Sequence, residues 1–157
     1  MFFTLYPIIK FANYLALFVF VLAFLTDSLD GYLARKNGQI TNFGKIMDPL
    51  ADKLLVTAAL VCLSYKTIVS PWITVIILAR EFIVSGIRIA AAAEGKVIAA
   101  SAWGKIKTIW QFIALSLTLI FFEANLIVTI ALWIAVILTI ISGIDYVAKN
   151  AKHLSMT

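Results

Sequence analysis

Residues 11–65 read FANYLALFVFVLAFLTDSLDGYLARKNGQITNFGKIMDPLADKLLVTAALVCLSY. Two apolar runs flank a short polar stretch, which holds four of the chain's eight acidic residues: Asp27, Asp30, Asp48 and Asp52. A carboxylate near a bilayer is costly, and it usually marks function rather than packing. The stretch therefore predicts two membrane helices with an active site where their polar ends meet.

The composition of the whole chain extends this prediction to a complete membrane bundle. The chain has 157 residues, of which 63% are hydrophobic and 13% charged, and its mean hydropathy is +1.04. A soluble domain of this length would need more charge on its surface. Apolar runs of about 20 residues recur, and each is long enough to cross a hydrocarbon core of roughly 30 Å. We expect one domain, residues 1–157, with an all-α polytopic fold.

Five helices are predicted in this bundle. They are expected at about residues 11–33, 48–65, 71–93, 104–122 and 126–148. The pair Asp48-Pro49 is typical of a helix start, as is Pro71. Lysines and arginines concentrate beside the aspartates, after the third helix and near the C-terminus. Because basic loops face the cytoplasm, we expect the aspartate cluster to be cytoplasmic.

The net charge of +5 and the pI near 9.4 are compatible with a nucleic-acid binder. No basic patch lies on a soluble element, however, and basic loops also bind anionic lipid headgroups. We therefore expect the lipid bilayer, and no nucleic acid, as a partner. The single cysteine, Cys62, excludes an internal disulfide, and the single histidine, His153, argues against a histidine metal site.

The spacing of the four aspartates indicates a metal site. Asp27 and Asp30 are three residues apart, and Asp48 and Asp52 four apart. On a helix both spacings put the pair on one face, within about 6 Å. Four carboxylates this close would repel one another, and an all-oxygen set suits Mg²⁺ or Mn²⁺. Mg²⁺ often completes its shell with phosphate oxygens, so a phosphate or diphosphate substrate is indicated.

Small residues alternate with these aspartates. Gly31, Ala34 and Gly44 would let a ligand approach the backbone closely, and Arg35 lies beside them. Small residues also serve in the packing of membrane helices. Their position among the aspartates favours a ligand pocket.

The whole polar pattern resembles that of a known family. The chain contains Asp27-x2-Asp30-Gly31-x2-Ala34-Arg35-x8-Gly44-x3-Asp48-x3-Asp52, which matches without departure the signature of the CDP-alcohol phosphatidyltransferases. The flanking sequences are similar to the bacterial phosphatidylglycerophosphate synthase branch, the CDP-diacylglycerol–glycerol-3-phosphate 3-phosphatidyltransferases. These similar stretches are residues 42–53, 79–88, 104–108 and 142–146.

The resemblance implies a reaction and roles for residues. The phosphatidyl group of CDP-diacylglycerol would move to the 1-hydroxyl of glycerol 3-phosphate, with CMP leaving. Asp27, Asp30, Asp48 and Asp52 would hold Mg²⁺ or Mn²⁺, and Asp52 would also be the general base. CDP would contact Gly31, Ala34, Arg35 and Gly44. The resemblance also implies a multi-pass protein of the bacterial plasma membrane and a homodimer.

The acceptor site is predicted on the third helix and the residues after it. Arginines inside an apolar run are costly unless they are paired or face a wet cavity. One alternative is that Glu81, on the same helix, simply neutralises one of them. The other is a basic pocket for the phosphate of the acceptor. Its candidate residues are Arg80, Arg88, Lys105 and Lys107.

The resemblance has one departure, at the N-terminus. Members of the family typically have six transmembrane helices, and the segment that opens the first of them has no match here. We therefore expect five helices and an N-terminally incomplete domain. Two alternative functions stay open: another enzyme of the family, such as a cardiolipin or phosphatidylinositol-phosphate synthase, or an inactive truncated or non-catalytic membrane protein.

Overall fold

The computed structural model describes the backbone of residues 12–36, 42–93 and 101–154, and the side chains of residues 13–26, 53–91 and 101–150. In these ranges all regular secondary structure is helical, which confirms the all-α prediction. The helices are α2 (Ala12–Lys36), α3 (Asn42–Tyr65), α4 (Pro71–Ala93), α5 (Ala102–Phe121) and α6 (Leu126–Leu154).

The predicted start of the second helix was wrong. Helix α3 begins at Asn42, so Asp48 and Pro49 lie inside it rather than at its first turn. A proline inside a helix removes one backbone hydrogen bond and crowds the preceding turn, which is why Pro49 indicated a helix start. Before it, Phe43, Ile46 and Met47 already follow the helical spacing of apolar residues, which supports an earlier start. By contrast, α4 has the predicted bounds.

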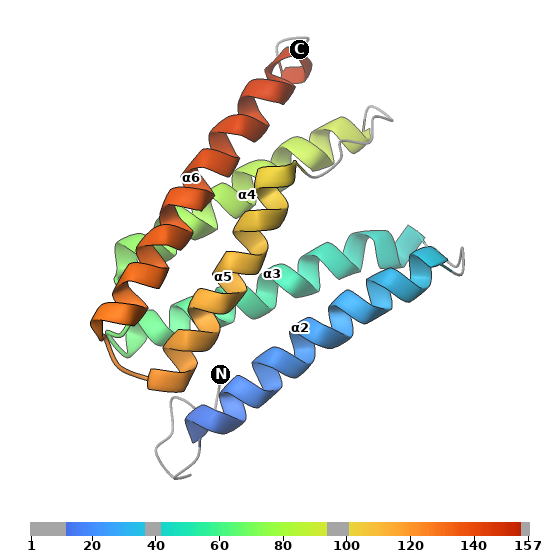
Figure 1. Cartoon of the computed structure of the whole chain (residues 1–157). Helices are drawn as coiled ribbons and strands as arrows, with labels where there is room; N and C mark the ends of the chain where they lie inside the picture. Colours follow the sequence, from blue (N-terminus) through green and yellow to red (C-terminus); the bar gives the residue numbers. More distant parts are fainter. Residues whose placement is uncertain (1–11, 37–41, 94–100, 155–157) are drawn as a thin grey trace.

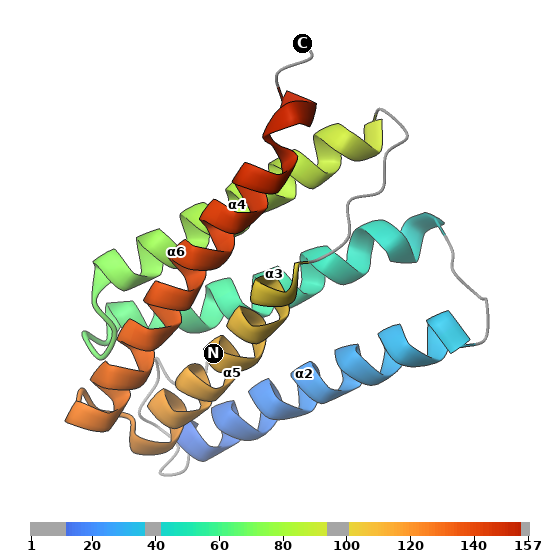
Figure 2. The ribbon, with the colours of Figure 1, turned by 45° about the horizontal axis from the view of Figure 1, so that its top comes forward.

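The helices run alternately up and down through the bundle. Helices α2 and α3 lie side by side, α5 packs on α2 and α6, and α4 packs on α3 and α6 (Figures 1 and 2). The turns that follow α3 and α5 lie at one end (Figure 1). The C-terminal end of α2, the start of α3 and the C-terminal ends of α4 and α6 lie at the other. The aspartate-bearing helix ends thus share one end of the bundle with the C-terminus of α6.

Local hydrogen bonds explain why the turn between α5 and α6 is short. Phe122 takes a left-handed conformation with φ 50°, and its N–H donates to the Thr118 carbonyl at 2.9 Å. Asn125 then caps α6, because its Oδ1 accepts the N–H of Val128 at 2.9 Å. These caps satisfy backbone groups that the helix ends leave open. The chain can therefore reverse within four residues, 122–125.

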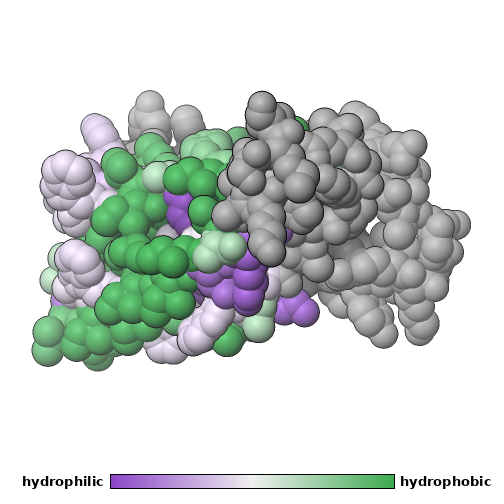
Figure 3. All heavy atoms as spheres, turned by 90° about the horizontal axis from the view of Figure 1, so that it is seen from above, coloured by the Kyte–Doolittle hydropathy of each residue, from purple (hydrophilic) through white to green (hydrophobic). Residues whose placement is uncertain are grey.

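The described surface is unusually apolar. Many large apolar side chains are exposed. Examples are Trp72, Phe82 and Ile89, which are 74%, 67% and 70% exposed. Figure 3 shows green apolar residues over most of the described part of one face, with hydrophilic residues gathered near the middle. By length and hydropathy, α5 and residues 126–150 of α6 can each cross a membrane. An apolar surface of this kind fits contact with lipid.

Candidate active site

The backbone places the predicted metal and nucleotide residues on two neighbouring helix ends. Asp27 and Asp30 lie on the C-terminal part of α2, and Asp48 and Asp52 on the N-terminal part of α3. In both ribbon views these two helix ends lie at the same end of the bundle (Figures 1 and 2). The helical spacing expected for each pair therefore holds for the backbone, and a set of carboxylates on adjacent helix ends suits a hard divalent cation.

The side chains of these residues lie outside the described part of the chain, so their metal and nucleotide contacts stay predictions. The residues predicted to contact the nucleotide lie on the same two helix ends. Those residues are Gly31, Ala34, Arg35 and Gly44. Among the side chains that are described, no group of three or more His, Cys, Asp or Glu residues comes together. The described side chains therefore offer no alternative metal centre.

Glu81 is the centre of a buried ionic cluster. Arg80 Nη1 lies 3.3 Å from Glu81 Oε1, and Lys107 Nζ on α5 donates to the same oxygen. The three side chains are 13%, 17% and 3% exposed for Arg80, Glu81 and Lys107. Charges this deeply buried are stable only when they are paired and hydrogen-bonded. Glu81 thus holds two of the four predicted acceptor-site cations.

Arg80 is also held from the side of α6. Its Nη2 donates to Ser142 Oγ. A Cβ on Gly143 would lie 3.2 Å from Arg80 Cγ, and one on Gly104 would lie 3.7 Å from Arg80 Nη2. Because these two residues are glycines, the Arg80 side chain has enough space between α4, α5 and α6.

Helix α3 contributes a third cation, which the sequence analysis missed. Lys53, the residue after Asp52, donates through Nζ to Ser85 Oγ on α4. Ser85 Oγ in turn donates to the Glu81 carbonyl at 2.5 Å. Polar residues inside apolar helices were the available signal, but sequence spacing cannot show that α3 and α4 bring these two together.

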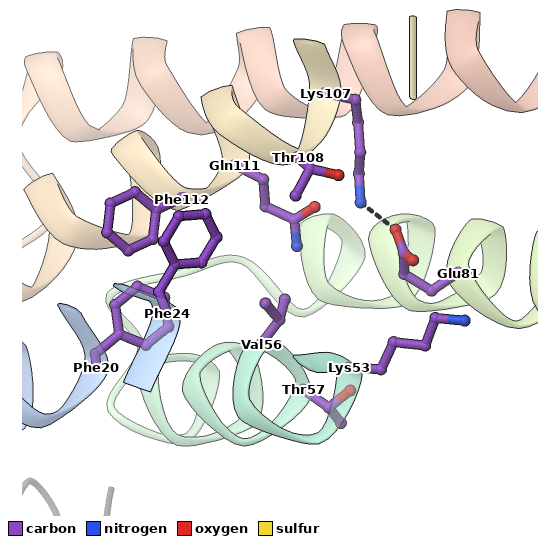
Figure 4. Close-up of a pocket in the computed structure, with 10 residues that line it drawn as sticks. All are labelled: Phe20, Phe24, Lys53, Val56, Thr57, Glu81, Lys107, Thr108, Gln111 and Phe112. Atoms are coloured by element: carbon purple, nitrogen blue, oxygen red, sulfur yellow. Dashed lines mark hydrogen bonds and ion pairs between the residues drawn. The ribbon is translucent and has the colours of Figure 1, made fainter. Parts of the chain in front are cut away.

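A pocket lies between these polar groups and an aromatic cluster. The enclosed part of the pocket is small, about 30 Å³, and it opens into a wider mouth. Glu81, Lys107 and Lys53 lie on one side of it, and phenylalanines from α2 and α5 lie on the other (Figure 4). Phe112 stacks on Phe24 with ring centroids 3.9 Å apart, and on Phe20 at 5.5 Å. The pocket therefore has a charged end, with two lysines and one carboxylate, and an apolar end.

The other two predicted acceptor residues lie elsewhere. Arg88 Nε donates to Tyr146 Oη on α6 at 3.2 Å, and its guanidinium lies 5.5 Å from the centre of that ring. Lys105 is exposed on α5. Neither residue lines the pocket, and of the four predicted acceptor residues only Lys107 does. The structure thus gathers Arg80 and Lys107 around Glu81 and places Arg88 against α6.

This arrangement can bind a small phosphorylated molecule. Arg80, Lys107 and Lys53 come from three helices and meet at one level of the bundle. Guanidinium and ammonium groups at the mouth of a partly dry pocket bind phosphate well. Because Lys53 directly follows Asp52 on α3, the pocket adjoins the aspartate-bearing end.

Comparisons with known proteins agree with the sequence pattern. The profile of the CDP-alcohol phosphatidyltransferase family matches residues 1–141. A CDP-diacylglycerol–glycerol-3-phosphate 3-phosphatidyltransferase of Bacillus subtilis is 45% identical over 141 residues, which cover 87% of this chain and 73% of the relative. The enzyme of the same name from Rickettsia bellii is 41% identical over 156 residues, which cover 96% and 86%. A probable phosphatidylglycerophosphate synthase of Mycobacterium tuberculosis is 41% identical over 145 residues, which cover 91% and 69%. The chain therefore belongs to the CDP-alcohol phosphatidyltransferase family.

Proposed function

We propose that this chain is a membrane enzyme of phospholipid synthesis, which transfers the phosphatidyl group of CDP-diacylglycerol to the 1-hydroxyl of glycerol 3-phosphate. The products are phosphatidylglycerophosphate and CMP. The observation that carries this proposal is the 41–45% identity to phosphatidylglycerophosphate synthases over most of the chain. The buried cations around Glu81 support it, because they suit an acceptor that carries a phosphate.

The donor site is proposed at the facing ends of α2 and α3. Enzymes of this family use divalent metal ions, and we propose Mg²⁺ or Mn²⁺ on Asp27, Asp30, Asp48 and Asp52. When bound, such an ion would neutralise charge on the diphosphate as CMP departs. Asp52 would accept the proton of the attacking hydroxyl. CDP would be held by the small and basic residues of the same helix ends, Gly31, Ala34, Arg35 and Gly44.

The acceptor site is proposed in the pocket beside Glu81. Lys107, which is buried and lines the pocket, would hold the phosphate of glycerol 3-phosphate. Arg80, which contacts the same oxygen of Glu81 from outside the lining, would add positive charge nearby. Arg88 and Lys105 lie outside the pocket and would attract the anionic acceptor from a distance.

The setting of the reaction follows from its substrates. The diacylglycerol of the donor lies in the bilayer, while the acceptor and CMP are water-soluble anions. We propose that the chain is a multi-pass protein of the bacterial plasma membrane with the active site facing the cytoplasm, where the basic loops would also lie. A homodimer is proposed from the family resemblance alone.

Release of CMP tests the proposed reaction. Purified protein in detergent micelles with CDP-diacylglycerol is expected to release CMP only when glycerol 3-phosphate and Mg²⁺ or Mn²⁺ are both present. EDTA should stop the release, and excess Mg²⁺ should restore it. Release that persists in EDTA would contradict the metal site. Release without an acceptor would contradict a transferase.

The space around Arg80 gives a prediction about acceptor binding. Gly143→Val is expected to displace Arg80, since even a Cβ at this position would lie 3.2 Å from Arg80 Cγ. Strain of about 1–3 kcal/mol is typical of such overpacking. We expect the KM for glycerol 3-phosphate to rise at least about fivefold, with a smaller change in the KM for CDP-diacylglycerol. Gly86→Ala is the control, because a Cβ there meets nothing within 4 Å. Equal changes in both KM values would contradict this role of Arg80.

A further inference from the structure

Gln111 is a buried polar residue that the reaction outlined above does not use. Its side chain is on α5, only 3% of the residue is exposed, and it points into the pocket beside Glu81 (Figure 4). Its Oε1 is buried and has no hydrogen-bond partner. A buried amide oxygen without a partner destabilises the fold, because it has lost its hydrogen bonds to water. Such a group needs a donor from a ligand or from water.

No described side chain in the walls of the pocket donates to this oxygen, and Lys53 and Lys107 donate to Ser85 and Glu81. Phe20, Phe24, Val56 and Phe112 have no polar side-chain atoms. The hydroxyl of Thr108 already donates to the Gly104 carbonyl at 3.0 Å. A hydroxyl on a bound molecule would fill the place well, because an amide can both accept from a hydroxyl and donate to it.

Gln111 also lies at a suitable distance from the proposed phosphate site. It follows Lys107 by four residues on α5, so the two side chains share one face and are separated by about one helical turn, roughly 5–6 Å. The spacing applies to the Cβ atoms, so two side chains of this length can contact one small phosphate ester, with Lys107 at the phosphate and Gln111 at the hydroxyl on the middle carbon. Lys107 and Gln111 both line the pocket.

We propose that Gln111 determines acceptor specificity by hydrogen bonding to the 2-hydroxyl of glycerol 3-phosphate. This inference rests on the proposed function, because it takes the acceptor phosphate to lie at Lys107 and Arg80. Gln111 thus selects a polyol phosphate over an alcohol phosphate of the same length that lacks the middle hydroxyl. A site built to bind a hydroxyl rejects the analogue without it far more strongly than an apolar site does.

The test compares two acceptors, glycerol 3-phosphate and 3-hydroxypropyl phosphate, which differ only in the 2-hydroxyl. Wild-type enzyme is expected to favour glycerol 3-phosphate by about 10- to 100-fold in kcat/KM. Gln111→Met preserves size and chain shape but removes the amide, and it should reduce this preference to about threefold or less. Gln111→Leu provides a second apolar variant if the first folds poorly. Ser116→Ala, on the same helix outside the pocket, is the control and should keep the wild-type ratio.

The ratio of the two acceptors separates specificity from a structural role. If Gln111 only stabilises the bundle or a water molecule, its variants will slow both acceptors equally and the ratio will stay at the wild-type value. That result would overturn the inference, as would a wild-type enzyme that uses both acceptors equally well. A wild-type enzyme that releases CMP with neither acceptor would overturn the proposed function itself.

Discussion

Asp52→Asn is expected to lower kcat by about a thousandfold or more. The asparagine has nearly the same shape, so it fits the same place on α3, but it cannot accept the proton of the attacking hydroxyl. It is also a weaker ligand for a divalent cation. Both losses act on the chemical step, so the KM for CDP-diacylglycerol should change much less than kcat. Release of CMP at saturating substrates measures the effect.

The matched control for this change is Asp145→Asn. Asp145 pairs with Lys149 at 2.7 Å on α6, as the i,i+4 spacing indicates. Lys149 is 65% exposed and Asp145 19% exposed, and a pair with one end in solvent contributes little. The control should therefore retain activity within about twofold of wild type. If Asp52→Asn also kept more than a tenth of wild-type activity while remaining folded, Asp52 would not be the general base.

Glu81→Gln is expected to weaken both the fold and acceptor binding. It removes the carboxylate that Lys107 and Arg80 both contact. Removing one partner of a buried ion pair typically costs about 3–5 kcal/mol, and the partly exposed Glu81 should lie at the lower end. The thermal midpoint in detergent should therefore fall clearly. The KM for glycerol 3-phosphate should rise at least tenfold, because the two cations lose their fixed positions.

A double variant separates these two effects. In Glu81→Gln with Lys107→Met, the buried ammonium is gone together with its carboxylate, so much of the lost stability should return. Acceptor binding should not return, because a cation of the proposed phosphate site is missing. Recovery of both the thermal midpoint and the KM for glycerol 3-phosphate would show that the Glu81 cluster is structural only. Recovery of neither would show that Lys107 stabilises the bundle by other contacts.

The number and sequence of the described helices could be predicted from the amino-acid sequence, but the residues at which some helices begin or end could not. Apolar periodicity gave the bounds of α4 because a proline and a polar loop mark them. Helix α6 continues to Leu154, beyond the predicted end near residue 148. There Asn150 Nδ2 donates to the Tyr146 carbonyl at 2.8 Å, and both residues are buried. By hydropathy alone, a buried polar residue such as Asn150 looks like a loop residue, so the predicted end of α6 came too early.

The chemistry of the site was more predictable than its contacts. Charge in an apolar run is costly, so the sequence itself drew attention to Arg80 and Arg88, and it indicated Lys107 as a further cation of the same basic pocket. That the same carboxylate, Glu81, meets both Arg80 and Lys107 depends on how α4 and α5 cross. The parts played by Lys53 and Gln111 likewise depend on three-dimensional packing, since their sequence positions are ordinary for helices of this kind.

Identification of the lipid product tests the central proposal most directly. Purified protein is given CDP-diacylglycerol, Mg²⁺ and equal concentrations of glycerol 3-phosphate and inositol 1-phosphate, and the lipids are analysed by mass spectrometry. We expect phosphatidylglycerophosphate in an amount equal to the CMP released. Phosphatidylinositol phosphate as the main product, or CMP release with no new phospholipid, would contradict the proposed transfer to glycerol 3-phosphate.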